Sequence, residues 1–252
     1  MISLQVGQPR VLPTWQDVSR FRRAERTRLL AARALSSTAR QSATDTLIQA
    51  LVSEVPFVSG SKLAVYWPIR GEPDLREWMI SAHKAGVAVL LPVVTEKGAP
   101  LEFHHWQPDC RMARGIWNIL VPADGAPDVP DIVVSPLVGV DQQLYRLGNG
   151  GGYYDRTLAL LSPTPRVIGV GFDGCRLPSV FPMPWDIRMD TVIDIHPRSS
   201  PQPEPKPIPR RSFRQGHKLS LKPPIRLLTT GFSSRSCCAG FQSRSALIRR
   251  EG

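Results

Sequence analysis

The feature that most constrains the fold is an alternation of short strand-forming runs with helical stretches between residues 63 and 195. Strands are predicted over 63–67, 87–94, 101–106, 132–140, 167–172 and 191–195, and helices over 16–34, 38–52, 75–84 and 153–161. Strands that alternate with helices favour a mostly parallel sheet with helices on both faces. We therefore predict an α/β fold, in which ligands bind at the carboxyl ends of the strands.

One glycine-rich segment stands out within this pattern. Residues 146–156 read Arg-Leu-Gly-Asn-Gly-Gly-Gly-Tyr-Tyr-Asp-Arg; they follow the predicted strand 132–140 and include the start of the predicted helix 153–161. Glycines bring bare N–H groups close to a ligand, arginines bind anionic oxygens, and a helix start favours anions. Asp155 adds an oxygen ligand for a hard cation. The segment predicts a phosphate site, although a glycine cluster by itself is also typical of a flexible turn.

The common nucleotide motifs do not describe this segment. The sequence contains no Gly-x-x-x-x-Gly-Lys-Ser/Thr, and Tyr153 stands where the dinucleotide motif needs its third glycine. Residues 146–156 instead resemble the signature of the 5-formyltetrahydrofolate cyclo-ligase family, also called methenyltetrahydrofolate synthetases. Residues 64–74, 86–94 and 184–190, the last reading Pro-Trp-Asp-Ile-Arg-Met-Asp, resemble further segments of that family in the same order. The resemblance covers roughly residues 20–197.

The resemblance implies a three-layer α/β/α fold that is Rossmann-like, of the type shared with phosphosugar isomerases and coenzyme A transferases. It also implies a reaction. ATP phosphorylates the formyl oxygen of 5-formyltetrahydrofolate, N10 attacks the activated carbon, and phosphate leaves to give 5,10-methenyltetrahydrofolate. Such a site acts mainly by positioning its substrates and neutralising charge. Other readings are an enzyme of the same fold with another small substrate, and a binding protein that acts through its basic tail.

Site residues follow from the resemblance, position by position. The expected ATP-binding residues are Arg22, Arg26, Arg146, Leu147, Gly148, Asn149, Gly150, Gly151, Gly152, Tyr153 and Tyr154. The expected folate-binding residues are Trp67, Glu72, Asn149, Gly150, Gly151, Gly152 and Tyr153. Catalysis is expected of Arg146, Tyr153 and Asp155, with Mg²⁺ as cofactor on Asp155 and on Asp186 as a second carboxylate.

Several of these assignments have alternatives. Arg22 and Arg26 lie four residues apart and hence on one helix face, but Arg23 could replace Arg22, and the basic stretch 20–33 could simply face solvent. Trp67 could be a core residue and Glu72 a surface turn residue. Because Glu72 follows the strand run 63–67, it could reach the same crevice as the glycine segment from a neighbouring strand. Trp117 borders the expected site and is assigned to packing.

The net charge of +11 is misleading, because it comes almost entirely from one end of the chain. Residues 198–252 hold 12 Lys and Arg against 2 Asp and Glu, whereas the other 197 residues hold 20 against 19. Alternating prolines after residue 200 block helix and sheet, so we expect a domain over 1–197 and a basic, disordered tail over 198–252. The tail could be an extension, an appendage of one lineage or a shifted reading frame. It could bind nucleic acid or an acidic partner weakly, whereas the domain should not.

The cysteines and the apolar runs bear on the compartment. Cys110, Cys175, Cys237 and Cys238 form neither a disulfide framework nor a zinc motif. No apolar run reaches the roughly 18 residues that cross a bilayer, and we find no signal-peptide core. We expect a cytoplasmic protein without membrane contact, monomeric, with 5-formyltetrahydrofolate and ATP as its small-molecule partners.

Overall fold

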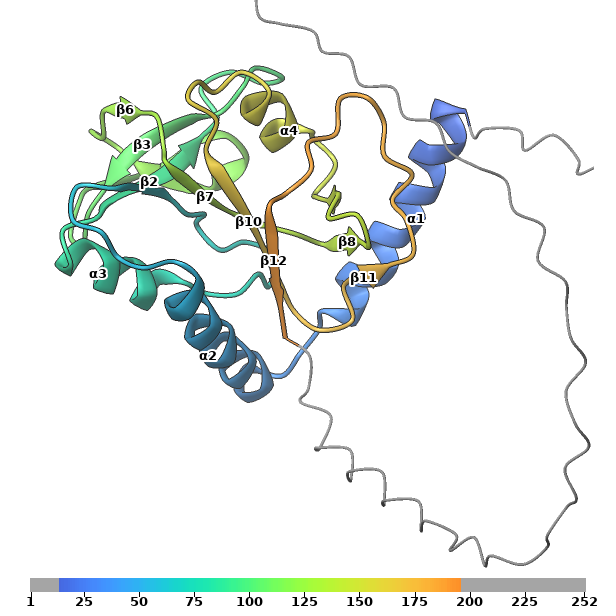
Figure 1. Ribbon diagram of the computed structural model, residues 1–252, viewed down its shortest axis with the longest axis horizontal. Coiled ribbons are helices and arrows are strands. Elements are labelled where there is room, and N and C mark those ends of the chain that lie inside the picture. The colour runs from blue at the N-terminus through green and yellow to red at the C-terminus, as the bar shows by residue number, and fades with distance from the viewer. Residues whose placement is uncertain (1–13, 196–252) are drawn as a thin grey trace, which may run out of the picture. The chain divides into compact units, whose positions relative to one another are not determined.

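The computed structural model describes residues 14–195, which form an α/β fold around a seven-stranded sheet (Figure 1). The predicted tail, 198–252, lies outside the described residues. The helices are α1 (Trp15–Ala32), α2 (Ser37–Glu54), α3 (Arg76–Lys84) and α4 (Tyr153–Leu158), with a 3₁₀ turn at Ile116–Asn118. The main sheet contains β1 (Lys62–Ala64), β2 (Ala88–Val93), β3 (Glu102–Trp106), β6 (Pro127–Asp128), β7 (Ile132–Pro136), β10 (Arg166–Gly171) and β12 (Thr191–Asp194).

The main sheet is mostly parallel, as predicted. Its order is β12-β10-β7-β1-β2-β3-β6, and the first five strands in this order run parallel to one another. β3 pairs antiparallel with β2, and β6 pairs antiparallel with β3. The two long N-terminal helices and α3 also lie where the sequence pattern placed them, within one to two residues at most ends.

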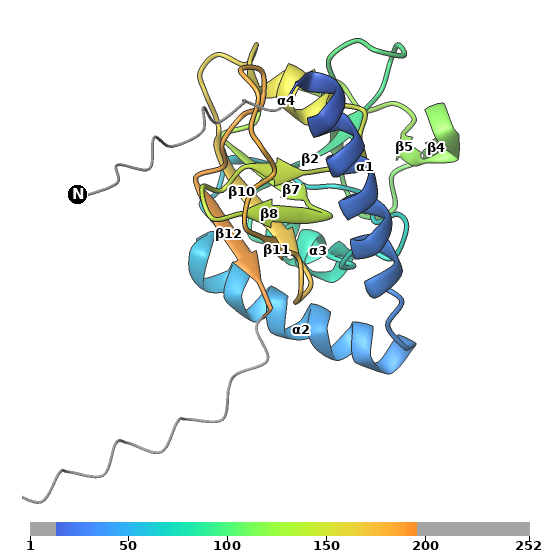
Figure 2. The ribbon, with the colours of Figure 1, turned by 90° about the vertical axis from the view of Figure 1, so that its right-hand side faces the viewer.

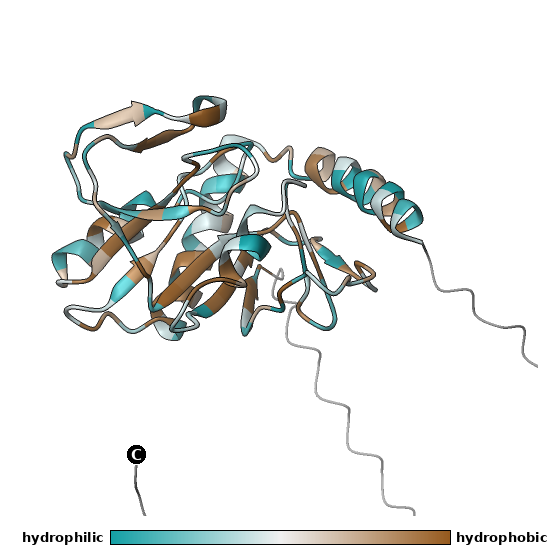
Figure 3. Ribbon diagram, turned by 90° about the horizontal axis from the view of Figure 1, so that it is seen from above, coloured by the Kyte–Doolittle hydropathy of each residue, from teal (hydrophilic) through white to brown (hydrophobic). Residues whose placement is uncertain are grey.

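Helices cover both faces of the main sheet. Successive residues of each strand point to opposite faces and therefore pack against different helices. Val89 and Leu91 of β2 join the core cluster under α2 and α3, whereas Leu90 joins the cluster on the other face with Leu158 of α4. The predicted three-layer α/β/α arrangement is therefore confirmed. Apolar residues concentrate on the strands of the sheet, while α1 is largely hydrophilic along its length (Figure 3).

The predicted strand 132–140 is not one strand. β7 ends at Pro136, and β8 (Gly139–Asp141) belongs to a second sheet with β9 (Arg146–Leu147) and β11 (Arg176–Leu177). The backbone N–H of Leu137 still bonds to the β10 residue Val170, but that of Val138 bonds to Leu147. The apolar run is continuous because both halves are buried, so hydrophobicity could not mark the crossing. The glycine segment therefore follows β9 and the small sheet, not a strand of the main sheet.

Helix α1 packs on this small sheet (Figure 2). Leu29 of α1 joins a cluster with Val138, Leu147, Leu177 and Val180. Thr14 caps the helix, since its hydroxyl accepts the N–H of Asp17 while the Asp17 carboxylate accepts the N–H of Thr14. A fixed start and a packed face give α1 a defined register over the small sheet.

A separate hairpin lies outside the main sheet. β4 (Met112–Arg114) pairs antiparallel with β5 (Leu120–Pro122), and Trp117 lies in the turn between them. Trp117 and Asn118 have φ of 59° and 63°, a left-handed conformation that is uncommon for a tryptophan.

None of the helices among residues 14–195 is long and apolar enough to span a bilayer.

The contact between α1 and β8 leads to a test of stability. A Cβ on Gly139 would lie 2.8 Å from Leu29 Cδ1 and 3.2 Å from the carbonyl oxygen of Cys175. We expect Gly139→Ala to lower the free energy of unfolding by about 1–3 kcal/mol, because α1 must move away. In combination with Leu29→Ala, the loss should be smaller than the sum of the two single losses.

Urea unfolding of the four proteins measures this coupling. Gln142→Ala, an exposed position one residue after β8, serves as the control and should change stability by no more than about 0.5 kcal/mol. Strict additivity of the Gly139 and Leu29 effects would contradict the packing described here.

Candidate functional site

Residues 148–152 of the glycine segment form an exposed loop between β9 and α4, here called the glycine loop. Gly150 has φ of 101° and Gly152 has φ of 64°, both in the region that favours glycine. A Cβ on Gly150 would lie 3.1 Å from Arg26 Cζ, and one on Gly148 would lie 2.9 Å from Arg146 Nη1. Two guanidinium groups, one from α1 and one from β9, therefore contact the glycine backbone of this loop at positions where a side chain would not fit.

Arg26 is held in place by the loop itself. Its Nε donates to the carbonyl oxygen of Gly148 over 2.8 Å. The pKa of Arg26 lies below its usual value, first because burial withdraws water from the guanidinium and then because Arg22 and Arg23 carry the same charge. No carboxylate among the described residues lies within ion-pair distance of Arg26. An anion bound here would thus meet a partly desolvated cation without a competing partner.

Arg146 pairs with the other key residue of the segment, Asp155. Arg146 Nη2 lies 2.9 Å from Asp155 Oδ2, with the two side chains only 7% and 17% exposed. The guanidinium also lies over the ring of Tyr154, 4.8 Å from its centroid. Asp155 Oδ1 accepts the backbone N–H of Ile187 over 3.2 Å. The carboxylate is fixed from two sides, and each oxygen retains a second lone pair.

Arg22 and Asp186, predicted for ATP and metal respectively, form an ion pair with each other. Arg22 Nη1 donates to Asp186 Oδ1 over 3.0 Å, and its other donors bond to the carbonyl oxygens of Val180 and Phe181. Asp186 Oδ2 also accepts the N–H of Met183 over 2.6 Å. Both groups are engaged in holding the segment between β11 and β12 against α1.

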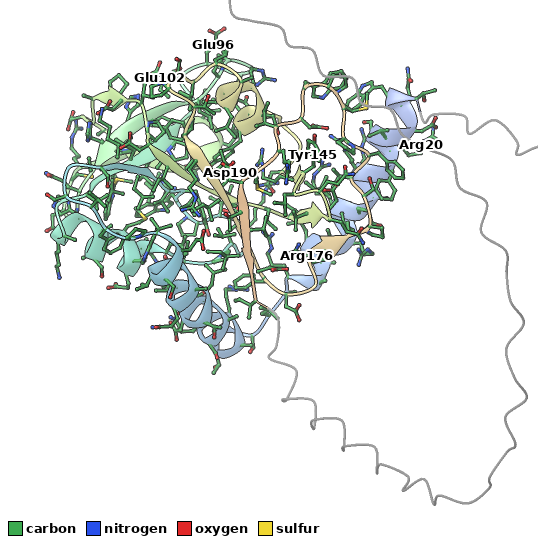
Figure 4. All side chains as sticks on the ribbon, in the orientation of Figure 1. Arg20, Glu96, Glu102, Tyr145, Arg176 and Asp190 are labelled. Carbon is green, nitrogen blue, oxygen red and sulfur yellow. The ribbon has the colours of Figure 1, made fainter. Side chains whose placement is uncertain are left out.

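The remaining arginines of α1 divide by helix face. Arg20 and Arg23 are exposed, and Arg20 lies on the outer side of the helix (Figure 4). Arg33, which the sequence analysis left unassigned, is buried and donates from Nη2 to the carbonyl oxygen of Leu137 over 2.6 Å. Its spacing of seven residues from Arg26 is the signal that could have placed it on the same face.

Glu72 reaches the glycine loop from the turn after β1, as the sequence order allowed. Its Oε1 accepts the side-chain amide of Asn149 over 3.3 Å, and its Oε2 accepts the N–H of Ile69 over 3.1 Å. Glu72 is buried, and this burial raises the pKa of its carboxyl above the ordinary value, although Ile69, Arg33 and Asn149 partly oppose the shift. The alternative of a surface turn residue is wrong.

Trp67 is placed differently from Glu72. It packs partly into the core cluster on the α3 face, and Arg76 lies over its ring, 5.5 Å from the centroid. Its predicted contact with folate stays a prediction.

Tyr153 links the loop to two segments that the sequence analysis did not include in the site. Its hydroxyl accepts the backbone N–H of Gly98, in the loop between β2 and β3, over 2.9 Å. Its ring meets Trp117 edge to face, with centroids 5.2 Å apart, and Arg156 lies 5.5 Å from its centroid. Trp117 is half exposed, so the hairpin turn forms part of the wall beside the loop instead of the core. The sequence analysis had placed Trp117 at the border of the site and assigned it to packing, whereas the Gly98 contact has no local sequence signal.

Helix α4 contributes less than its position suggested. It has six residues, so its dipole is small, and a phosphate at the loop would interact mainly with the backbone N–H groups, Arg26 and Arg146. Within residues 14–195 no three His, Cys, Asp or Glu side chains are grouped closely enough to hold a metal by themselves. A metal here would need one protein carboxylate together with ligand oxygens and water, as Mg²⁺ commonly has.

Known proteins are similar to this chain in sequence and in fold. The protein from Mycolicibacterium smegmatis named 5-formyltetrahydrofolate cyclo-ligase is 30% identical over 144 residues, covering 54% of this chain and 74% of that protein. The Escherichia coli K12 protein of the same name is 32% identical over 146 residues, covering 55% and 80%. Among solved structures, the Aquifex aeolicus 5,10-methenyltetrahydrofolate synthetase matches with a TM-score of 0.60 and 28% identity, covering 69% of this chain and 89% of that one.

A second solved structure, of a 5,10-methenyltetrahydrofolate synthetase from Mycoplasma pneumoniae, has the same fold. Its TM-score is 0.57 at 24% identity, and the match covers 68% of this chain and 97% of that chain. The model of the 5-formyltetrahydrofolate cyclo-ligase family matches residues 18–194, which span all three sheets, the glycine loop and all four helices except the first turn of α1. This chain belongs to the 5-formyltetrahydrofolate cyclo-ligase family.

Proposed function

We propose that this protein converts 5-formyltetrahydrofolate and ATP into 5,10-methenyltetrahydrofolate, ADP and phosphate. The observation that carries this proposal is the closure of Arg26 and Arg146 on the Gly148–Gly150 backbone, beside the fixed carboxylate of Asp155. Two guanidinium groups and a row of bare N–H groups suit a polyphosphate, whose transfer needs alignment and charge neutralisation. The names of the relatives support the folate substrate.

The chain's own residues would divide the work as follows. Arg26, which reaches the loop from α1, binds phosphate oxygens, and Arg146 stabilises the charge that develops on the transferred phosphoryl group. Tyr153, fixed through Gly98, and Asn149 border the folate. Glu72 accepts hydrogen bonds from pterin N–H groups, and Trp67 packs beside the ring. Because Glu72 and Asn149 are bonded to each other, folate and nucleotide would meet at their junction.

Asp155 suits Mg²⁺, because it is a fixed carboxylate with a free lone pair on each oxygen. Bound Mg²⁺ would neutralise phosphate charge. Asp186 is the proposed second carboxylate, and to serve it must release Arg22 and the N–H of Met183. Arg22 would then become available to ATP, as the sequence resemblance implies.

The wider assignment is part of the same proposal. The family match over 18–194 supports a domain that ends near residue 197, with 198–252 as a separate tail. Among the described residues, Cys110 and Cys175 form no disulfide, which suits a reducing compartment such as the cytoplasm. We also propose that the protein is a monomer.

The first test is the absorbance of 5,10-methenyltetrahydrofolate when the protein meets 5-formyltetrahydrofolate, Mg²⁺ and ATP. We expect product only with ATP. Asp155→Asn should lower kcat at least about 100-fold, because the variant loses a charge that helps to position the transferred phosphoryl group. The apparent affinity for Mg²⁺ should fall as well.

Asp124→Asn provides the control, since Asp124 is exposed and pairs with Arg111 beside the hairpin. It should retain wild-type kcat. A slow Asp155→Asn enzyme with an unchanged Mg²⁺ dependence would contradict the metal role and restrict Asp155 to holding Arg146.

Arg26 allows a separate test of the phosphate site. Arg26→Ala should weaken ATP binding about 10- to 100-fold, because charge-assisted hydrogen bonds to phosphate are lost. Arg28→Ala, which removes an exposed arginine paired with Glu25 on the same helix, should leave the dissociation constant unchanged. Isothermal titration with ATP measures both, and equal effects of the two variants would show that α1 supplies only a general positive charge.

The raised pKa of Glu72 predicts a pH effect on stability. The folded protein holds this proton more tightly than the unfolded chain, so Glu72 costs stability increasingly as pH rises from about 4.5 through its folded pKa. Glu72→Gln removes this titration. The unfolding free energy of the variant relative to wild type should therefore increase between pH 4 and pH 7 in urea titrations. A difference independent of pH would refute the shift.

A further inference from the structure

Four aromatic side chains form a surface patch where α1 meets the segment between β11 and β12. This aromatic patch consists of Trp15, Phe21, Phe181 and Trp185. Trp15 is 46% exposed, Phe181 42% and Trp185 54%. Large exposed aromatic rings that gather in one place commonly mark a binding surface.

The rings are arranged as two edge-to-face pairs. Trp15 and Trp185 have centroids 5.3 Å apart with their planes at 79°, and Phe21 and Phe181 have centroids 5.1 Å apart at 86°. An edge-to-face contact uses the face of only one ring and the edge of the other. Since both tryptophans remain about half exposed, indole surface stays available to a flat ligand.

Arg22 ties the two sides of the patch together. From α1 this arginine donates to the carbonyl oxygens of Val180 and Phe181 and to the carboxylate of Asp186, the residue that follows Trp185. These bonds fix the segment against the N-terminal half of the helix, and the two run side by side in both views (Figures 1 and 2). A ligand would therefore meet preformed rings and lose little energy in ordering them.

The patch is continuous with the phosphate-binding loop along two paths. Two residues after Trp185, the N–H of Ile187 bonds to Asp155. Along α1, Trp15 precedes Arg26 by 11 residues, which corresponds to about 16 Å of helix rise. A nucleoside triphosphate in an extended conformation has a comparable length, so phosphates at Arg26 and a base at the tryptophans can belong to one molecule.

We propose that Trp15 and Trp185 bind the purine base of the nucleotide whose phosphates the glycine loop holds. The inference rests on the proposed function for the position of those phosphates. Aromatic side chains stack on the π-face that every base has, and such stacking tolerates changes in the base. The patch therefore gives affinity for a purine, with little discrimination between adenine and guanine, and it contributes nothing to binding of inorganic triphosphate.

The experiment compares ligands with and without a base. Isothermal titration of the full chain with Mg·ATP, Mg·GTP and Mg·tripolyphosphate gives dissociation constants for wild type, Trp15→Ala, Trp185→Ala and Trp185→Phe. Trp185→Ala should weaken ATP and GTP about tenfold and leave tripolyphosphate unchanged. Trp185→Phe should restore most of the loss, because phenylalanine can also stack. In the cyclisation assay, the KM for ATP should rise with little change in kcat.

Val52→Ala is the control, since Val52 is an exposed apolar residue on α2, whose buried residues pack on the opposite face of the main sheet. It should leave all constants unchanged, and thermal unfolding confirms that the variants are folded. Equal ATP affinity in wild type and in both tryptophan-to-alanine variants would overturn the proposal. So would an equal loss of ATP and tripolyphosphate, which would mean that the patch only supports the loop.

Two further outcomes separate this inference from the proposed function. If the wild-type protein binds ATP with the expected dependence on Trp185 but forms no methenyltetrahydrofolate, the base site stands and the cyclo-ligase assignment fails. If sedimentation shows a dimer that Trp185→Ala dissociates, while the affinity for ATP is unchanged, the patch belongs to a second copy of the chain and the base site fails.

Discussion

Three arginines on one face of α1 hold the helix against the loops that form the site. Arg22, Arg26 and Arg33 donate to backbone carbonyl oxygens at Val180 and Phe181, at Gly148, and at Leu137. Each acceptor lies in a connecting segment outside the main sheet, where the regular ladder of hydrogen bonds has ended. The guanidinium groups satisfy carbonyl groups that would otherwise need water, and they place the helix and the loops in one register.

This arrangement concentrates positive charge without a full set of counter-charges. Arg22 has Asp186 as its partner, but Arg26 and Arg33 have pKa values lowered first by burial, and Arg33 Nη1 is buried without a hydrogen-bond partner among the described residues. Burying a cation is costly unless an anion compensates for the lost water. A polyphosphate at the glycine loop would provide that compensation for Arg26, so the cost of burying this guanidinium and the proposed affinity for nucleotide have the same electrostatic origin.

The sequence predicted the elements whose signals are local. Helices α1 to α3 and the mostly parallel pairing of the main sheet follow from periodicity and composition, and the glycine loop follows from its motif. The approach of Glu72 to the glycine segment was also expected, although that segment follows β9 of the small sheet and not, as predicted, a strand of the main sheet. The split of 132–140 between two sheets could not be predicted, since buried residues look alike in either. The pairing of Arg22 with Asp186, 164 residues apart, and the approach of Trp117 to Tyr153 depend on tertiary packing alone.

The split strand has a consequence for motion in the protein. Only Leu137 and Val138 separate β7, in the middle of the main sheet, from β8, the central strand of the small sheet. Helix α1 packs on this small sheet, and the glycine loop follows its strand β9. Both residues of this short link are buried, and their N–H groups bond to Val170 of the main sheet and to Leu147 of the small sheet. A displacement of the small sheet would therefore be transmitted directly to the middle of the main sheet, because no slack chain separates the two.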